Sequence, residues 1–475
     1  MSAPSLRDSS TPSNTPHGAA GRNDDPLPRR RLVFAIVSLA LFMASVDQTI
    51  VSTALNAIQH DLHARINWSG WTITIYSLGQ IVAMPLAGRI SDQYGRKKIF
   101  LGAVVLFTTT SLLCGFANSI YLLLPLRALQ ALGGGAFMPS ASGIVSDQFG
   151  RDRDRALGMF TSIFPIGGIV GPIIGGVFVT YWSWRGIFLV NVPIGIVLLV
   201  LGSRFIPHSD RKVAAKTDLP GVLLLALLLI TAMFGITYLG TGGRPIWDPV
   251  FLGCEAVAIA AIVLFIRHAR RAAEPFIPIR LLHGKGFGVM NAINFLYGSA
   301  ALGFGALVPL YAEERYHIHT LQAGTLLTAR AVGMICVAGL AVMALRRTGY
   351  RLPMIVGFLT VGVGLLFMAM QPHGLSAYMW LAATAAITGI GMGLGMPAAN
   401  NASMQLAPDQ IAGISGLRGM FRQCGSIMSV SITTAILARS ANPGIAQAHV
   451  LIAFAVIIAF IVPLIFLVPD HRGGW

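Results

Sequence analysis

The feature that most constrains this chain is a series of apolar segments, each about 20 residues long, that runs from residue 32 almost to the C-terminus. A segment of that length crosses the hydrocarbon core of a bilayer as an α-helix. Only 11% of the residues are charged, against about 25% in soluble globular proteins. We therefore predict an all-α polytopic membrane protein with fourteen transmembrane helices. The predicted spans are 32–55, 70–88, 99–117, 121–146, 156–181, 186–206, 219–240, 249–267, 287–311, 322–345, 352–370, 378–402, 411–438 and 449–468.

Basic residues form short clusters between these segments. When alternate loops are assigned to opposite sides, 25 of the 34 Lys and Arg fall on the side of the N-terminus. Positively charged loops stay in the cytoplasm, so we predict that both termini are cytoplasmic and that the protein lies in a bacterial cytoplasmic (inner) membrane. The net charge of +16 forms no stripe or reader motif, which argues against a nucleic-acid partner. The four cysteines stand singly, without metal-ligand or redox spacing, and we expect neither a metal nor a cofactor.

An internal repeat relates the two halves of the chain. Small residues and a Met-Pro pair of segments 4 and 5 recur in segments 12 and 13 at an offset of 258 residues, for example Gly135 as Gly393 and Pro139 as Pro397. A shift of eight spans fits two six-helix bundles with two extra helices between them. The predicted division is a disordered cytoplasmic tail (1–31), an N-terminal bundle (32–206), a linker with the extra helices (207–286), a C-terminal bundle (287–469) and a cytoplasmic tail (470–475).

A short charged stretch, residues 88–98, lies between the second and third segments. Gly88 and Gly95 allow the tight backbone of a turn, and Asp92 can sit at a helix N-terminus. Arg96 begins a cluster of three basic residues that would hold this loop in the cytoplasm. We predict a cytoplasmic hairpin loop here.

Two polar side chains interrupt otherwise apolar helices. Asp47 lies in the middle of segment 1, where an ionised carboxylate costs several kcal/mol, and Arg127 lies in segment 4, where it cannot shed its charge. Gln130 follows one turn after the arginine. Each of these residues is either functional or a structural polar contact between helices, and the sequence leaves both readings open.

Segment 5 carries a face of small residues. Gly167, Gly171 and Gly175 are spaced by four, which lets another helix approach closely, and Pro172 removes one backbone hydrogen bond. Helix packing alone would explain this face equally well.

Together these motifs resemble the fourteen-span drug:proton antiporter family of the major facilitator superfamily, over nearly all of the chain after residue 30. The stretch 182–195, with Trp184 and Asn191, is also similar to that family. The resemblance implies the major facilitator fold and export of small amphipathic compounds in exchange for protons by alternating access. It implies a cytoplasmic latch made by Arg96 and Asp147 together with the loop residues, and an antiporter role for the helix 5 glycines. The cavity residues that it implies are Gln130, Arg330, Arg422 and Gln423.

The chain departs from drug exporters that carry extra acidic residues in the C-terminal helices. Segment 13 has Arg418 and Arg422 and no carboxylate, and Glu313, a further candidate cavity residue, lies near the outer end of segment 9. A dianionic, zwitterionic or neutral amphipathic substrate therefore fits better than a dication. For coupling, we predict that Asp47 carries the proton and that Arg127 promotes its release.

Other classes of function are disfavoured. The sequence has no Gly-Lys-Ser/Thr nucleotide loop and no metalloprotease or serine-hydrolase motif, so we expect neither an ATP-driven pump nor an enzyme. A facilitator or symporter of the same fold, for a lipid or a metabolite, remains the alternative. The expected partners are a small-molecule substrate, protons, the lipid bilayer and, as a further candidate, a periplasmic adaptor protein.

Overall fold

The computed structural model describes residues 27–468 except 65, 209–217, 241–243, 273–274, 276, 285, 304–306, 319, 373, 408–409 and 438. The first 26 residues of the predicted N-terminal tail and the predicted tail at 470–475 lie outside this part of the chain. The first helix begins at Leu27, earlier than the predicted boundary at residue 32.

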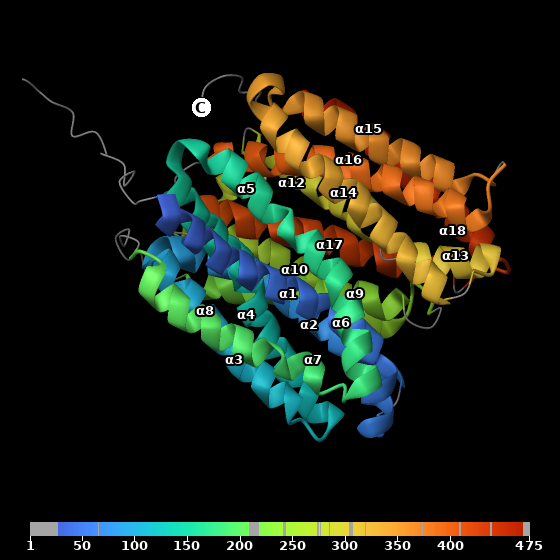
Figure 1. Ribbon diagram of the computed structural model, residues 1–475, viewed down its shortest axis with the longest axis horizontal. Coiled ribbons are helices and arrows are strands. Elements are labelled where there is room, and N and C mark those ends of the chain that lie inside the picture. Colours follow the sequence, from blue (N-terminus) through green and yellow to red (C-terminus); the bar gives the residue numbers. More distant parts are fainter. Residues whose placement is uncertain are drawn as a thin grey trace, which may run out of the picture.

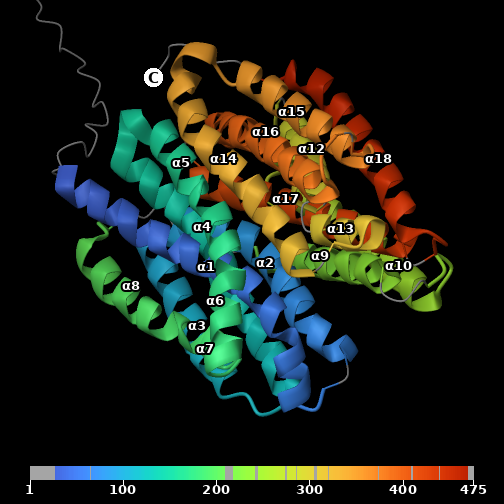
Figure 2. The same cartoon turned by 45° about the vertical axis from the view of Figure 1, so that its right-hand side comes forward.

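The described residues form a helical molecule of two bundles (Figures 1 and 2). The N-terminal bundle contains α1 (Leu27–Asp61), α2 (Ile66–Tyr94), α3 (Arg96–Gly115), α4 (Ile120–Phe149), the short turn η1 (Gly150–Asp152), α5 (Arg153–Thr161), α6 (Ile163–Tyr181), α7 (Gly186–Leu189) and α8 (Asn191–Phe205). Between the bundles in sequence come α9 (Leu219–Gly240), α10 (Pro249–Arg271) and α11 (Ile279–His283). The C-terminal bundle contains α12 (Phe287–Tyr297), the π-helical turn η2 (Gly298–Gly303), α13 (Val308–Tyr316), α14 (Thr320–Thr348), α15 (Arg351–Ala369), α16 (Ala377–Gln405), α17 (Ile411–Leu437) and α18 (Pro443–Ile465).

The helices confirm a multi-pass membrane protein. Within the described residues, 12 helices are long and apolar enough to cross a bilayer. The other two predicted spans correspond to α17, which carries two arginines, and to 287–311, which is divided among α12, η2 and α13. The predicted spans 156–181 and 186–206 are interrupted as well, after Thr161 and after Leu189. The total of fourteen spans stays a prediction.

The two bundles pair their helices in the same way. α4 packs against α2 and α3, and α16 packs against α14 and α15. A side chain at Gly135 would collide with Ala83 of α2, and one at Gly393 would collide with the carbonyl of Met334 on α14. Glycine at both positions of the 258-residue repeat thus lets a helix of the same bundle approach closely.

The predicted loop at 88–98 is wrong in its extent. α2 continues through Gly88 to Tyr94, and α3 begins at Arg96, so Gly95 alone separates the helices, with a left-handed φ of 101°. Gly88 is not a turn residue. A Cβ atom there would lie 2.5 Å from the carbonyl oxygen of Ala412 on α17, so glycine is needed for contact between the two bundles.

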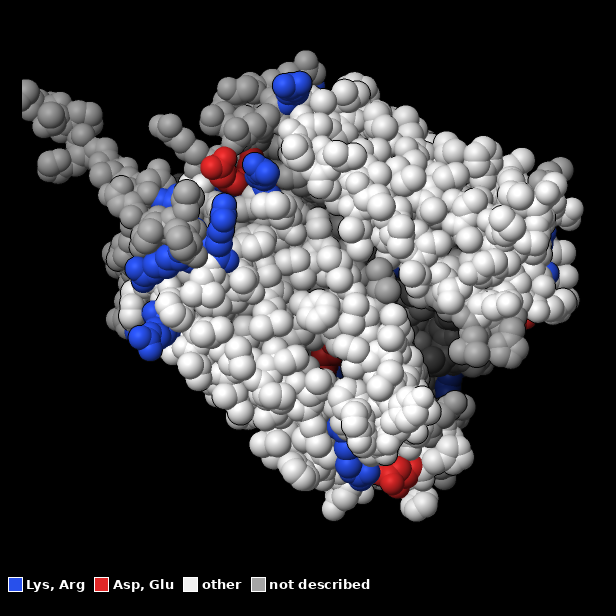
Figure 3. Space-filling view, in the orientation of Figure 1, with Lys and Arg blue, Asp and Glu red and all other residues white. Residues whose placement is uncertain are grey.

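The bundles meet closely at one end of the molecule, which we call the basic end. It is the end where α1 begins and α2 ends, and it carries Arg89, Arg153 and the cluster at 96–98. Figure 3 shows most of the visible Lys and Arg there, and shows the surface hollowed between the bundles on the side away from it. The structure is therefore closed at its basic end.

The extra helices do not lie apart from the bundles. α9 packs against both α2 and α17, where Leu225, Leu229 and Met233 join an apolar cluster with Ile81 and Leu417. α10 packs mainly on α9 and leaves much of its other face exposed. α9 thus covers the line along which the two bundles meet.

Candidate functional site

The polar residues predicted in segments 1 and 4 meet inside the N-terminal bundle. The Asp47 carboxylate is 0% exposed and accepts hydrogen bonds from Arg127 Nη1 at 2.7 Å and from Gln130 Nε2 at 3.0 Å. Gln130 in turn accepts a hydrogen bond from Arg127 at 2.5 Å and donates to Ser111 of α3 at 2.6 Å. The helical spacing of Arg127 and Gln130 places both on the face of α4 that meets α1.

Aromatic rings enclose this network. The Arg127 guanidinium, 1% exposed, lies 4.1 Å from the ring centre of Tyr76 on α2 and 5.3 Å from that of Phe188 on α7. A cation above the face of an aromatic ring is attracted by the ring's negative π-face. The arginine is thus held by one carboxylate, one amide and two rings, and water is excluded from its surroundings.

Asn191 is a member of the network that the sequence did not reveal. Its Nδ2 donates to Asp47 Oδ1 at 2.8 Å, from the first residue of α8. The same stretch of chain holds α1 a second time, because Trp184 and Arg185 both donate to Asp61. In the sequence, Asn191 was marked only by its place in the family-like stretch 182–195, near the start of a predicted span.

The helix 5 glycines face α1. A Cβ atom on Gly167, Gly171 or Gly175 would lie 2.6, 2.1 or 2.2 Å from the side chain of Ser45, Thr49 or Thr53, respectively. Both rows are spaced by four residues, so α6 and α1 approach along matching faces. Pro172 lies within α6, one residue after the second glycine of this row. These contacts explain the glycine pattern by packing, and its antiporter role stays a prediction.

The predicted latch pair forms, but within one bundle. Arg96 of α3 makes an ion pair with Asp147 of α4, donates to the Gly143 carbonyl at 2.8 Å, and lies 3.3 Å from Asp92. Asp147 is 45% exposed. This pair fixes α3 to α4 and does not itself join the two bundles.

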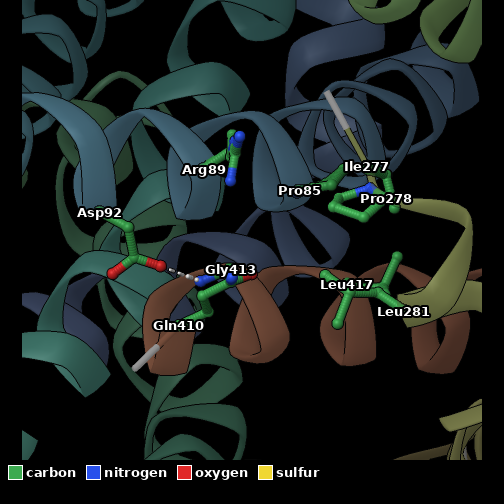
Figure 4. Close-up of a pocket in the computed structure, with 9 residues that line it drawn as sticks. All are labelled: Pro85, Arg89, Asp92, Ile277, Pro278, Leu281, Gln410, Gly413 and Leu417. Carbon is green, nitrogen blue, oxygen red and sulfur yellow. Dashed lines mark hydrogen bonds between the residues drawn. The ribbon is translucent and has the colours of Figure 1, made fainter. Parts of the chain in front are cut away.

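Asp92 makes the connection between bundles at this point. Its Oδ2 accepts a hydrogen bond of 2.9 Å from the backbone N–H of Gly413, in the first turn of α17 (Figure 4). The N-terminus of a helix presents unpaired N–H groups and attracts negative charge. Asp92 lies near the C-terminal end of α2, not at a helix N-terminus of its own loop, and its carboxylate instead meets the N-terminus of a helix in the opposite bundle. A small cavity of about 20 Å³ adjoins this contact, bordered by Arg89 and by Leu281 of α11.

A second group of contacts closes the basic end. The Asp154 carboxylate of α5 accepts hydrogen bonds from Tyr350 at 2.9 Å and from Gln405 at 3.3 Å, and Asn401 donates to the Asp154 carbonyl. Burial raises the pKa of the Tyr350 hydroxyl, which therefore stays protonated and remains a donor. Arg153 donates to Gln405 at 2.8 Å. Tyr350 belongs to the connection after α14, the counterpart of the α2–α3 turn in the repeat.

The other predicted cavity residues are spread over the C-terminal bundle. Glu313 lies on α13, away from the Asp47 network, and Arg330 lies on α14. Arg422 and Gln423 lie on α17, and Arg422 is buried with its Nη2 3.7 Å from the sulfur of Met138 on α4. The structure therefore brings Arg422 to the boundary between the bundles and leaves Glu313 near the opposite end.

The sequence and the fold agree on the family of this chain. The family model of the Major Facilitator Superfamily matches residues 37–307 and 290–475. The chain belongs to the Major Facilitator Superfamily. A solved structure of XylE, a proton:xylose symporter of this superfamily, has the same fold, with a TM-score of 0.66 over 94% of this chain and 97% of that chain at 13% identity.

Curated members of the superfamily are similar over most of the chain. The multidrug transporter protein MdtP of Bacillus subtilis is 28% identical over 421 residues, which cover 87% of this chain and 76% of that protein. A multidrug resistance protein B homolog of Mycobacterium tuberculosis is 30% identical over 412 residues, covering 85% and 75%. This superfamily member is thus a membrane transporter of small molecules, not an enzyme.

Proposed function

We propose that this transporter is a proton-coupled exporter of small amphipathic compounds that works by alternating access. Relatives named as multidrug transporters or multidrug resistance proteins match more than four fifths of the chain, which supports export. The observation that carries proton coupling is the Asp47 carboxylate, fully buried beside Arg127. A carboxylate in such a place binds a proton when the cation moves away and releases it when the cation returns.

In this proposal the structure represents one of the two alternating states. The basic end, which we assign to the cytoplasm together with both termini, is closed by Asp92, Asp154 and their partners. The hollow between the bundles then faces the other side of the membrane, from which a proton would enter. Protonation of Asp47 would remove its attraction for Arg127 and loosen the contact of α1 with α4. A periplasmic adaptor protein as a further partner stays a prediction.

The test is uphill transport in proteoliposomes with an imposed pH gradient. We expect Asp47→Asn to retain binding and exchange of a fluorescent amphipathic dye but to lose accumulation against a gradient, and Asp47→Glu to retain part of it. Trapped pyranine would report the accompanying proton movement. Because the single Asn variant leaves Arg127 uncompensated, the double variant Asp47→Asn/Arg127→Gln provides a neutral control. If Asp47→Asn still exports the dye uphill when a pH gradient is imposed, the coupling site lies elsewhere. If transport by the unmodified protein does not depend on the pH gradient, a facilitator is favoured.

A further inference from the structure

Two arginines of α17 lie on the face that this helix presents to the N-terminal bundle. Ser415 contacts Ser142 of α4 at 3.2 Å, and Arg422 reaches Met138 one turn earlier on α4. Arg418 lies between them on the same helical face and is 1% exposed. The side chains of Arg418 and Arg422 thus follow one another along the boundary between the bundles, about 6 Å apart along the helix axis.

Among the residues that the structure describes, no carboxylate pairs with either arginine. In the described part of the protein, the Nε and both Nη atoms of Arg418 are buried without a hydrogen-bond partner, and so is Nη1 of Arg422. The sequences of α12 and of α14 to α18 contain no Asp or Glu. The one carboxylate of α4, Asp147, pairs with Arg96 instead. A guanidinium cannot become neutral in a protein, so both charges stay buried.

Arg127 is a second deeply buried arginine of the same chain and provides a comparison. It is as deeply buried as Arg418, yet it has Asp47, Gln130 and the ring of Tyr76 as partners. A buried charge without such partners is strongly disfavoured. The contrast favours a partner for Arg418 other than the described side chains.

We propose that Arg418 and Arg422 bind the negatively charged group of the transported compound, an apolar molecule that carries one carboxylate or sulfonate. This assignment rests on the proposed export function and names its substrate class. A guanidinium binds a carboxylate through two parallel hydrogen bonds. The surroundings suit the apolar part, because Met84 of α2 and Met138 of α4 face the same stretch of α17. Methionine side chains adapt to ligands of different shape.

The position of the two arginines also determines in which conformational state a ligand can reach them. Arg418 is seven residues from the start of α17 at the basic end, about 10 Å into the molecule. The contacts of α2 and α4 with α17 cover it in the closed state seen here. Separation of these helices would open it to the basic side, where an anion could bind. A bound anion would neutralise the guanidinium and so remove the electrostatic barrier to closing around it, and the cargo would thereby promote the change of state.

The test compares a carboxylate with its neutral ester. N-dansyl-leucine is an apolar monoanion, and its methyl ester has nearly the same shape without the charge. Binding of each to the purified protein in nanodiscs is measured by dansyl fluorescence, with no pH gradient, and empty nanodiscs are subtracted. We expect the acid to bind the unmodified protein more than about tenfold more tightly than the ester. Arg418→Gln should lose this preference, Arg418→Lys should restore part of it, and the exposed Arg204→Gln should leave it unchanged.

Equal affinity for acid and ester in the unmodified protein, or no binding of either, would overturn the assignment without need of any variant. So would an equal loss of both ligands in a folded Arg418→Gln, because that pattern indicates a structural role. If Arg418→Gln does not fold, Arg422→Gln provides the same comparison. The binding assay uses no gradient, so its failure is distinct from a failure of proton-coupled export, which only the proteoliposome assay reports.

Discussion

Asp92 should control how readily the basic end opens. In Asp92→Asn the amide oxygen can still accept the Gly413 N–H, but the negative charge at the start of α17 is lost. Hydrogen bonds to charged groups contribute about 1.5–3 kcal/mol and neutral ones about 0.5–1.5, and an anion at a helix N-terminus adds about 0.3–1. We therefore expect the free energy of the closed state relative to the open state to rise by about 1–2 kcal/mol. This corresponds to roughly a 5- to 30-fold rise in the ratio of open to closed molecules.

Asp147→Asn is the matched control. Asp92 is 8% exposed and bonds across the bundles, whereas Asp147 is 45% exposed and pairs with Arg96 inside one bundle. An exposed ion pair contributes about 0–1 kcal/mol, and its loss would act on both states alike. The control should therefore leave the ratio of open to closed molecules nearly unchanged.

Spin labels at two exposed positions would report the opening. Arg204 at the end of α8 and Leu352 at the start of α15 belong to different bundles and lie at the basic end. After replacement of the native cysteines, pulsed electron resonance gives the distribution of distances between the labels. In Asp92→Asn the longer distances should gain population. The reasoning is refuted if the distribution matches that of the unmodified protein, or if Asp147→Asn shifts it by as much.

Two further predictions concern packing and orientation. Gly171→Val should lower the stability of the protein by at least about 1–3 kcal/mol, because even its Cβ would overlap a threonine side chain of α1. Gly176→Ala is the control and should leave the stability unchanged, because the space around Gly176 is open. If the two variants melt at the same temperature, the α1–α6 contact is contradicted. A cysteine that replaces the exposed Trp182 should react with an impermeant thiol reagent in intact cells. A cysteine that replaces the exposed Lys98 should react only after the cells are permeabilised. The reverse labelling pattern would mean that the proposed topology is inverted.

Much of the polar core could be predicted because buried charge stands out in an apolar helix. Asp47, Arg127 and Gln130 were singled out in this way, and the structure joins them directly. The part that Asn191 plays in this network was missed because an uncharged amide near the start of a span is unremarkable in sequence. Its role depends on the rotation of α8 against α1, which sequence does not specify.

The roles of the glycines were predicted less well, because glycine is required both in turns and where two helices pack closely. Gly95 is the turn residue that it was predicted to be, with a left-handed backbone. Gly88, seven residues earlier, lies inside a helix and allows α17 to approach. Local sequence cannot separate these uses, since the neighbour that requires a glycine can lie more than 300 residues away.

The sequence by itself determined the class of protein, the positions of most membrane helices and the excess of basic residues on one side, because hydropathy and charge act on each segment separately. Only the tertiary structure decided which charges find partners. Asp92 was expected to act in its own loop and instead meets Gly413. Among the described residues, Arg127 bonds to Asp47 and Gln130, whereas the Nε and both Nη atoms of Arg418 have no hydrogen-bond partner. Such contacts depend on how helices distant in sequence rotate and pack together. An unpaired charge is strongly disfavoured in a low-dielectric interior, so that packing decides whether a buried arginine finds its partner within the chain or, as we propose for Arg418, in a ligand.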